Sequence, residues 1–505
     1  MRWRDELTAA TAVIILTLII GTPSLTYILD IDHGEHAYVA SAYLRGKTIY
    51  TDVFFVRTPL NYIIYAVSEV LFGHSMMSIR LFDIIWQCAT ALSILALTNR
   101  FYGRKYAGII SAFIYVLLYY SNKYADTAQA DGFTTLPVTL ALLAYVHAKK
   151  SDRPWTWVLC GMLLGTAFTI KYPIAVLVLI LLAFMTRREG PGDWPKRVSW
   201  MIAGFCVPPL LMTASLAAEG SLYDFLFIQY YHIKGYSSET VTLRIALILY
   251  FALTWMPFNL VPLYEAYSLR SRKSSTSQYL ILFWWIAGLA HMIVQNKFLL
   301  YHRLPMIAPL SIITARILIE MYGYYTIHAP KVRIVFLSIL LIAGYNIYVK
   351  LGHNDSLTDF TDLMLQRRDL NSIYMESEFG KKGIMNVSDY IRENSMPDDT
   401  IIVWGFNAGI YFLSERECAS RFPFNYPLYG RYDYTDGFRE QYIRELEENR
   451  PSHIVIMRND SMPLLVMTDE DSFHAFLEFK EFHDFTTENY DRKREINDFI
   501  IYERK

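Results

Sequence analysis

The densest group of ionisable residues follows the first long apolar run of the chain. Five of the seven residues from 30 to 36 can carry a charge: Asp30, Asp32, His33, Glu35 and His36. Because charge near lipid is costly, ionisable residues at a membrane boundary indicate function. A carboxylate there, with a pKa tuned by burial and neighbouring cations, is suited to accept a proton from a hydroxyl group.

Two other interpretations of this group stay open. If a helix begins near Gly34, Asp32 lies at its N-terminal edge and serves only as a cap. Alternatively, Asp32, Glu35 and His33 form a metal site, since carboxylates and imidazoles suit several divalent ions. The spacing does not distinguish these interpretations, so a divalent cation is an open alternative and no other cofactor is predicted.

The rest of this loop has an ordered pattern that includes a cation suited to phosphate. Arg57 is that cation, because a guanidinium binds phosphate through two parallel hydrogen bonds. The pattern runs through Gly46, Tyr50, Asp52, Arg57-Thr58-Pro59-Leu60, Phe72-Gly73-His74-Ser75 and Arg80.

This order resembles the first outer loop of the GT-C superfamily of lipid-linked-sugar transferases. That group includes protein O-mannosyltransferases and the enzymes that add aminoarabinose to lipid A. The chain departs from the family pattern at three points: His33 stands where Glu is frequent, Arg57-Thr58 replaces Lys-Pro, and Glu35 is displaced.

The resemblance implies further site residues. Asp131, rather than Asp126, matches an acidic residue before the fourth span, and Lys171 ends a glycine-rich span. The implied catalytic residues are Asp32, Asp131 and Glu35. The implied donor phosphate ligands are Arg57, Lys171, Lys297, His302 and Arg303. The alternative is that these are ordinary loop carboxylates and cations that anchor helix ends at the membrane interface.

The chemistry implied is sugar transfer from a polyprenyl-phosphate donor to an acceptor hydroxyl. The phosphate is a good leaving group, so cations near its bridging oxygen matter more than a general acid. We expect Asp32 to act as the base on the opposite face of the sugar, with Asp131 or Glu35 orienting the acceptor. A single displacement of this kind inverts the anomeric centre.

Membrane-spanning helices must position these residues. The chain has 505 residues, of which 53% are hydrophobic and 19% charged. Apolar runs dominate up to about residue 350 and predict about eleven spans. They lie near 8–29, 79–98, 106–121, 132–148, 155–170, 172–186, 198–218, 241–264, 279–294, 304–322 and 332–349. The two runs around Lys171 could instead be one span broken near Pro173.

Basic loops predict the orientation of these spans, because Lys and Arg gather on the cytoplasmic side. Basic residues occupy alternate loops, at 2–4, 100–105, 149–153, 187–197, 270–273 and 331–333. This pattern places the N-terminus in the cytoplasm and the loop 30–78 outside. The first apolar run lacks a small-residue cleavage site and is interpreted as a retained span.

The C-terminal part predicts a small α/β domain, because strand and helix patterns alternate there. Strands are expected at 400–404, 453–457 and 498–502, and helices at 383–394 and 437–449. These patterns predict a polytopic α-helical membrane protein, and the resemblance implies that its fold is of GT-C type. Residues 1–350 form its transmembrane catalytic domain and residues 351–505 an extracytoplasmic α/β domain.

The predicted protein is a multi-pass plasma-membrane glycosyltransferase that meets membrane lipids and a glycan, lipid or protein acceptor. A net charge of −1 without a basic tract excludes nucleic acid as a partner. The alternatives are a flippase for a lipid-linked sugar, an O-antigen ligase or polymerase with a diphosphate donor, and a non-catalytic scaffold. A transporter often shows inverted repeats, and we find none in the sequence.

Overall fold

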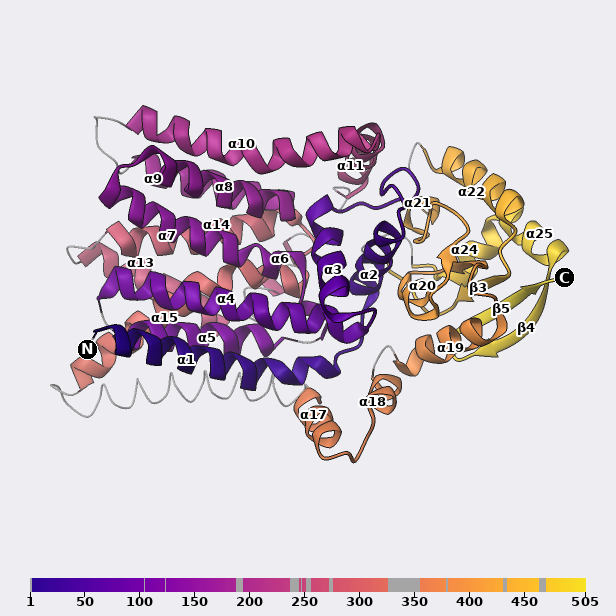
Figure 1. Cartoon of the computed structure of the whole chain (residues 1–505), viewed down its shortest axis with the longest axis horizontal. Coiled ribbons are helices and arrows are strands. Elements are labelled where there is room, and N and C mark those ends of the chain that lie inside the picture. The colour runs from indigo at the N-terminus through magenta and orange to yellow at the C-terminus, as the bar shows by residue number, and fades with distance from the viewer. Residues whose placement is uncertain are drawn as a thin grey trace. The chain divides into compact units, whose positions relative to one another are not determined.

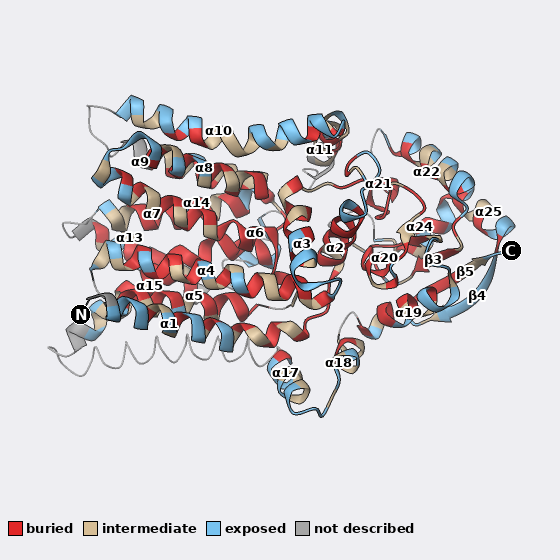
Figure 2. Ribbon diagram, in the orientation of Figure 1, coloured by how far each residue is buried: buried red, intermediate tan, exposed pale blue. Residues whose placement is uncertain are grey.

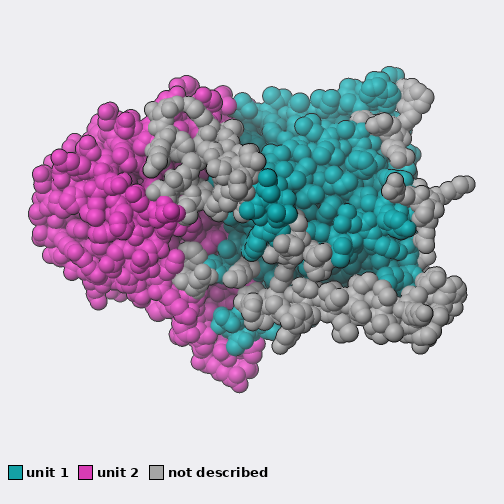
Figure 3. Space-filling view, turned by 180° about the vertical axis from the view of Figure 1, so that it is seen from behind, with its two compact units in different colours: residues 1–25, 80–213, 239–360 teal, residues 26–79, 214–238, 361–505 magenta. Residues whose placement is uncertain are grey.

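The computed structural model divides the chain into two compact units, shown in two colours in Figure 3. Unit 1 comprises residues 1–25, 80–213 and 239–360, and unit 2 comprises residues 26–79, 214–238 and 361–505. The structure describes residues 2–103, 105–122, 124–187, 194–236, 245–246, 248–250, 256–271, 276–325, 355–377, 380–429, 434–462 and 469–505.

Unit 1 is built from apolar helices, labelled in Figure 1. Five described helical segments are long and apolar enough to cross a membrane, and the chain is an integral membrane protein. Figure 2 shows the contrast between a mostly exposed α10 and a mostly buried α15. The helices are α1 (Arg2–Gly21), α4 (Met76–Tyr102, which begins in unit 2), α5 (Lys105–Tyr120), α6 (Ala130–Phe133), α7 (Thr135–Ser151), α8 (Pro154–Ile170), α9 (Ala175–Arg187), α10 (Trp194–Ala218, which ends in unit 2), α13 (Met256–Ser271), α14 (Thr276–Gln295) and α15 (Leu304–Tyr325).

Most of the expected spans coincide with helices of this unit. The span expected at 332–349 lies outside the described residues, and so does part of the one at 241–264. The helix is interrupted at Lys171, whose backbone is extended. A short 3₁₀ turn, Tyr172–Ile174, follows it before α9 begins. The runs on either side of Lys171 are therefore two helices.

Unit 2 combines the first loop with the C-terminal part of the chain. Its helices are α2 (Ile31–Leu44), α3 (Pro59–Phe72), α11 (Leu222–Tyr236), α17 (Ser356–Met364, which begins in unit 1), α18 (Leu370–Glu376), α19 (Ile384–Asn394), α20 (Gly409–Ser414), α21 (Tyr426–Tyr429), α22 (Thr435–Asn449), α24 (Ser472–Glu478) and α25 (Lys480–Asn489).

The described strands of unit 2 form one five-stranded mixed sheet in the order β2-β1-β3-β5-β4. The strands expected at 400–404, 453–457 and 498–502 are confirmed as β1 (Thr400–Trp404), β3 (His453–Met457) and β5 (Phe499–Arg504). The two edge strands were not predicted from the sequence. They are β2 (Glu417–Cys418), which has only two residues, and β4 (Tyr490–Ile496), whose middle is charged and exposed. Charged residues on an edge strand prevent pairing with other chains.

The first loop packs directly on the sheet domain within unit 2. A Cβ atom on Gly34 of α2 would lie 2.8 Å from the backbone of Gly409 in α20, so the two helices meet at their glycines. The Tyr38 hydroxyl accepts a hydrogen bond from the Cys418 amide at 3.0 Å. The expected domain boundary at 350/351 stays a prediction, because residues 326–354 lie outside the described part.

Candidate active site

Helix α2 begins earlier than expected and brings Asp32 into its first turn. It starts at Ile31, and its cap is Asp30, whose carboxylate accepts a hydrogen bond from the His33 amide at 2.8 Å. The interpretation of Asp32 as the helix cap is therefore wrong. Its side chain is available for another role.

Asp32 forms an ion pair with Arg57. The Arg57 Nη2 donates to Asp32 Oδ1 at 3.0 Å, and the two side chains keep 26% and 21% of their surfaces exposed. The backbone of Arg57 is held by Tyr50, whose hydroxyl donates to the Arg57 carbonyl at 2.8 Å. Pro59 is the first residue of α3, and its ring fixes φ at a helical value. This sets the direction in which the chain leaves the loop. A carboxylate in the first turn of α2 and a guanidinium just before α3 thus lie together.

Glu35 lies one helical turn after Asp32 and is only 3% exposed. Burial raises the pKa of Glu35 to about 7; the Arg57 charge opposes this rise and the Asp32 charge adds to it. Among the described residues we find no hydrogen-bond donor to the Glu35 carboxyl group. Near neutral pH this carboxyl group is therefore poised between its protonated and ionised forms.

His33 and His36 face other partners. His33 is buried, with Nδ1 2.5 Å from the Asp30 carboxylate. The His36 ring packs edge-on against Phe55 and Tyr65, at centroid distances of 5.7 and 5.2 Å. Over the described part of the chain, no three acidic, His or Cys side chains are grouped as metal ligands. The structure therefore gives no support to a metal site of Asp32, Glu35 and His33.

A second polar cluster lies in unit 1 around Asp131, which is fully buried. Lys171 forms an ion pair with its carboxylate, and His291 Nε2 lies 2.9 Å from Oδ1. Gln295 donates to the same oxygen at 3.3 Å. Burial alone would raise the pKa of Asp131, but the Lys171 charge and the His291 hydrogen bond hold it well below its usual range. Asp131 therefore stays ionised.

The remaining predicted cations lie in or near the short turn before α15. The Lys171 ammonium lies 5.3 Å from the centre of the Tyr301 ring, and that ring packs against His302 at 4.8 Å. A charge on His302 also lowers the pKa of Asp131. Arg303 instead donates to the Asn122 side chain. Lys297 is 5% exposed.

His291 and Gln295, which contact Asp131, were not predicted from the sequence. They lie four residues apart in α14, so they share one face of that helix. The available signal was a histidine inside an apolar span, which is expensive to bury unless it has a partner.

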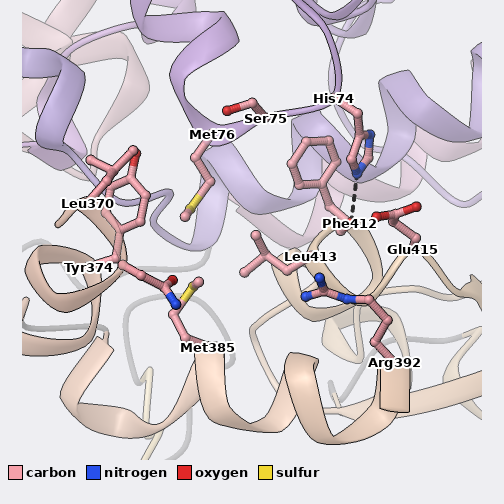
Figure 4. A pocket seen from close by; sticks show the side chains of 11 residues that line it. His74, Ser75, Met76, Leu370, Tyr374, Met385, Arg392, Phe412, Leu413 and Glu415 are labelled. Atoms are coloured by element: carbon pink, nitrogen blue, oxygen red, sulfur yellow. Dashed lines mark hydrogen bonds between the residues drawn. The ribbon is translucent and has the colours of Figure 1, made fainter. Parts of the chain in front are cut away.

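Unit 2 also contains a cavity of about 320 Å³, shown in Figure 4. Its apolar lining includes Met76, Tyr374 and Met385, and Arg392 and Glu415 also line it. The His74 ring stacks on Phe412 with a centroid distance of 3.9 Å. None of the described residues that line the cavity was predicted as a site residue.

Comparisons with known proteins agree with this architecture. A family profile for dolichyl-phosphate-mannose-protein mannosyltransferases matches residues 56–215. An undecaprenyl phosphate-alpha-4-amino-4-deoxy-L-arabinose arabinosyl transferase from Proteus mirabilis is 20% identical over 65% of this chain and 59% of its own length. A transferase of the same name from Photorhabdus laumondii is 21% identical over 52% of this chain and 49% of its own length. The chain thus spans about half to three fifths of these relatives.

The structural comparison covers nearly the whole chain. ArnT from Cupriavidus metallidurans, in a crystal structure with undecaprenyl phosphate, matches 97% of this chain and 97% of its own length with a TM-score of 0.66 and 13% identity. The apo form of ArnT matches with a TM-score of 0.59. This chain is therefore a polytopic membrane protein with a fold of the GT-C type, similar in sequence to undecaprenyl phosphate-alpha-4-amino-4-deoxy-L-arabinose arabinosyl transferases and in structure to ArnT.

Proposed function

We propose that the chain is an inverting glycosyltransferase that moves a sugar from a polyprenyl-phosphate donor to an acceptor hydroxyl. The observation that carries this proposal is the ion pair of Asp32 with Arg57, formed directly after the first span. A base and a phosphate-binding cation are the two groups that this reaction requires of the protein.

Donor binding changes this ion pair in the proposed mechanism. The donor phosphate accepts hydrogen bonds from the Arg57 guanidinium, in place of the Asp32 carboxylate. Asp32 then accepts the proton of the acceptor hydroxyl as the oxygen attacks the anomeric carbon from the face opposite the phosphate. The bond between that carbon and the phosphate oxygen breaks, and the polyprenyl phosphate leaves with both bonding electrons.

Glu35 and Asp131 have different roles in this scheme. Protonated Glu35 can donate a hydrogen bond to the acceptor, because its pKa is raised to about 7 by burial. Asp131 cannot exchange a proton near neutral pH, since Lys171 and His291 keep it ionised. Its role is to hold Lys171, whose charge stabilises the departing phosphate, with Lys297, His302 and Arg303 as further candidate contacts.

The names of the relatives suggest the first donor to test, and the basic loops suggest the side of the membrane. The relatives are named for transfer from undecaprenyl phosphate-alpha-4-amino-4-deoxy-L-arabinose. We propose a lipid-linked donor of this class, an acceptor that is a glycan, lipid or protein, and a reaction on the extracytoplasmic face of the plasma membrane.

The test is transfer by the purified full chain in lipid nanodiscs, with this donor and a panel of other polyprenyl-phosphate sugars. Asp32→Asn should lower the turnover number by at least about 100-fold, because general bases contribute that much. Arg57→Ala should raise the KM for the donor roughly 10-fold or more, because it removes charged hydrogen bonds to phosphate.

Both variants must insert and fold like the parent chain, which the elution profile in detergent checks. Near-normal turnover by Asp32→Asn would remove Asp32 from the role of base. If the chain moves donor between leaflets but forms no product with any acceptor, it is a flippase and the proposal fails.

A further inference from the structure

The turn that leads to Asp131 has a strained backbone. Ala128, three residues before Asp131, has φ of +56° and no exposed surface. For a residue with a Cβ atom, this left-handed conformation costs about 1 kcal/mol or more. It persists only where surrounding contacts hold the chain.

The Tyr119 hydroxyl of α5 provides such a contact. It accepts a hydrogen bond from the Ala128 amide at 3.0 Å and donates one to Asp83 Oδ1 at 2.7 Å. A Cβ atom on Gly132 would lie 3.0 Å from the same hydroxyl, so Tyr119 also packs closely against the backbone of α6. One buried hydroxyl thus touches the chain on both sides of Asp131.

Buried polar groups keep this hydroxyl in place. The Asp83 carboxylate on α4 also accepts hydrogen bonds from Gln87 at 2.9 Å and from Tyr120 at 3.3 Å. Tyr115 donates to Gln87 at 2.6 Å, so the network extends one turn along α5. A buried network whose members are hydrogen-bonded is rigid.

A second anchor holds the turn from α4. Arg80, fully buried, donates to both the carbonyl and the hydroxyl of Thr127, at 3.3 and 3.1 Å. The backbone from Thr127 to Gly132 is therefore fixed by α4 and α5, while the Asp131 side chain points to Lys171 and His291. The network contacts the backbone of the turn, whereas Lys171 and His291 contact the side chain.

We propose that Tyr119 is a positioning residue for Asp131 and, through it, for the Lys171 ammonium. The inference rests on the proposed function, in which Lys171 stabilises the departing phosphate. Without the Tyr119 hydroxyl the Ala128 turn relaxes, and Asp131 no longer holds Lys171 at the geometry that the transition state needs. Displacements of about 1 Å can cost up to about 100-fold in rate.

The test compares two chemically identical substitutions on one helix. Tyr119→Phe should lower the turnover number roughly 10-fold and leave the KM for the donor within about 2-fold, because Arg57 still binds the phosphate. Tyr115→Phe removes a hydroxyl from the same network, but that hydroxyl donates to Gln87, whereas the Tyr119 hydroxyl contacts the turn itself. It should retain activity. Equal losses in the two variants would overturn the proposal.

A rescue experiment separates positioning from general destabilisation. Glycine adopts positive φ without penalty, so Ala128→Gly should restore at least about half of the lost turnover to Tyr119→Phe. Failure of rescue with a folded double variant would contradict the proposal.

Asp131→Asn distinguishes the proposed glycosyltransferase activity from the proposed positioning role of Tyr119. If it retains full activity while Asp32→Asn is inactive, the proposed function stands and the role of Tyr119 falls. If the parent chain transfers no sugar from any donor, the proposed function itself fails. In that case a changed reactivity of Lys171 towards an amine reagent in Tyr119→Phe, but not in Tyr115→Phe, still reports positioning.

Discussion

Asp32, Glu35 and Arg57 lie close together but differ in burial and in pairing. Asp32 is paired with Arg57 and keeps contact with solvent, whereas Glu35 is buried beside them. The sequence indicated all three as site residues through the family pattern. It could not indicate their protonation, because burial and pairing depend on contacts made in the folded chain.

Glu35 predicts a pH dependence of stability. The rise of its pKa from 4.5 to about 7 corresponds to roughly 3 kcal/mol at about 1.4 kcal/mol per pKa unit. The folded state binds the proton more tightly than the unfolded state, so this stability is present below pH 4.5 and is lost as pH rises to about 7. Glu35→Gln cannot ionise, so its thermal midpoint should change less with pH over this window.

The measurement is the thermal midpoint of both proteins in detergent at several pH values, together with activity. The amide can still donate a hydrogen bond, so transfer should persist in Glu35→Gln, with a flatter pH profile near neutrality. Parallel midpoint curves for the two proteins would mean that Glu35 ionises like an exposed carboxyl group.

At the scale of elements, the placement of α2 depends on a contact between two glycines. Gly34 lies between Asp32 and Glu35 in the sequence and meets Gly409 of α20. Any side chain at position 34 would push α2 away from α20 and move both carboxylates. The contact therefore links the geometry of the site to the sheet domain.

Gly34→Ala should destabilise the protein by about 1–3 kcal/mol, the usual cost of overpacking, and should lower transfer. Gly437→Ala is the matched control. Gly437 lies in α22, and a Cβ atom there would meet nothing within 4 Å. It should stabilise by about 0.5–1 kcal/mol. The measurements are the thermal midpoints and turnover numbers of both variants. A Gly34→Ala variant with unchanged stability and transfer would contradict the prediction.

Elements were predictable from the sequence where one physical pattern dominates. Long apolar runs located the described spans, and β-branched runs located β1, β3 and β5. The charged strand β4 was missed because an exposed edge lacks the alternation of a half-buried strand. The sequence left the cap of α2 open, because Asp30 and Asp32 are both capping residue types. Only the hydrogen bond to the His33 amide distinguishes them.

At the scale of the whole molecule, three separate stretches of sequence make up unit 2. The general layout was predictable from hydropathy and the family pattern. The packing of the first loop on the sheet domain was not, since it joins residues more than 300 positions apart, such as Tyr38 and Cys418.

The predicted orientation is tested by labelling single introduced cysteines in intact cells. Met396 is 71% exposed in the sheet domain, so a membrane-impermeant maleimide should label Met396→Cys. Lys150→Cys, at an exposed position in the last turn of α7, should react only after permeabilisation. The parent chain, with its four cysteines, sets the background. The reverse pattern would invert the topology.

Unit 2 is assembled from three separate stretches of sequence, and this limits which chimeras with related proteins can fold. A chimera that exchanges only the C-terminal segment would set a foreign α20 against the native Gly34, where no side chain fits. It would also lose the ion pairs that Arg45 and Lys47 form with Glu417. A chimera with a relative should therefore fold only when residues 26–79, 214–238 and 361–505 are all exchanged together.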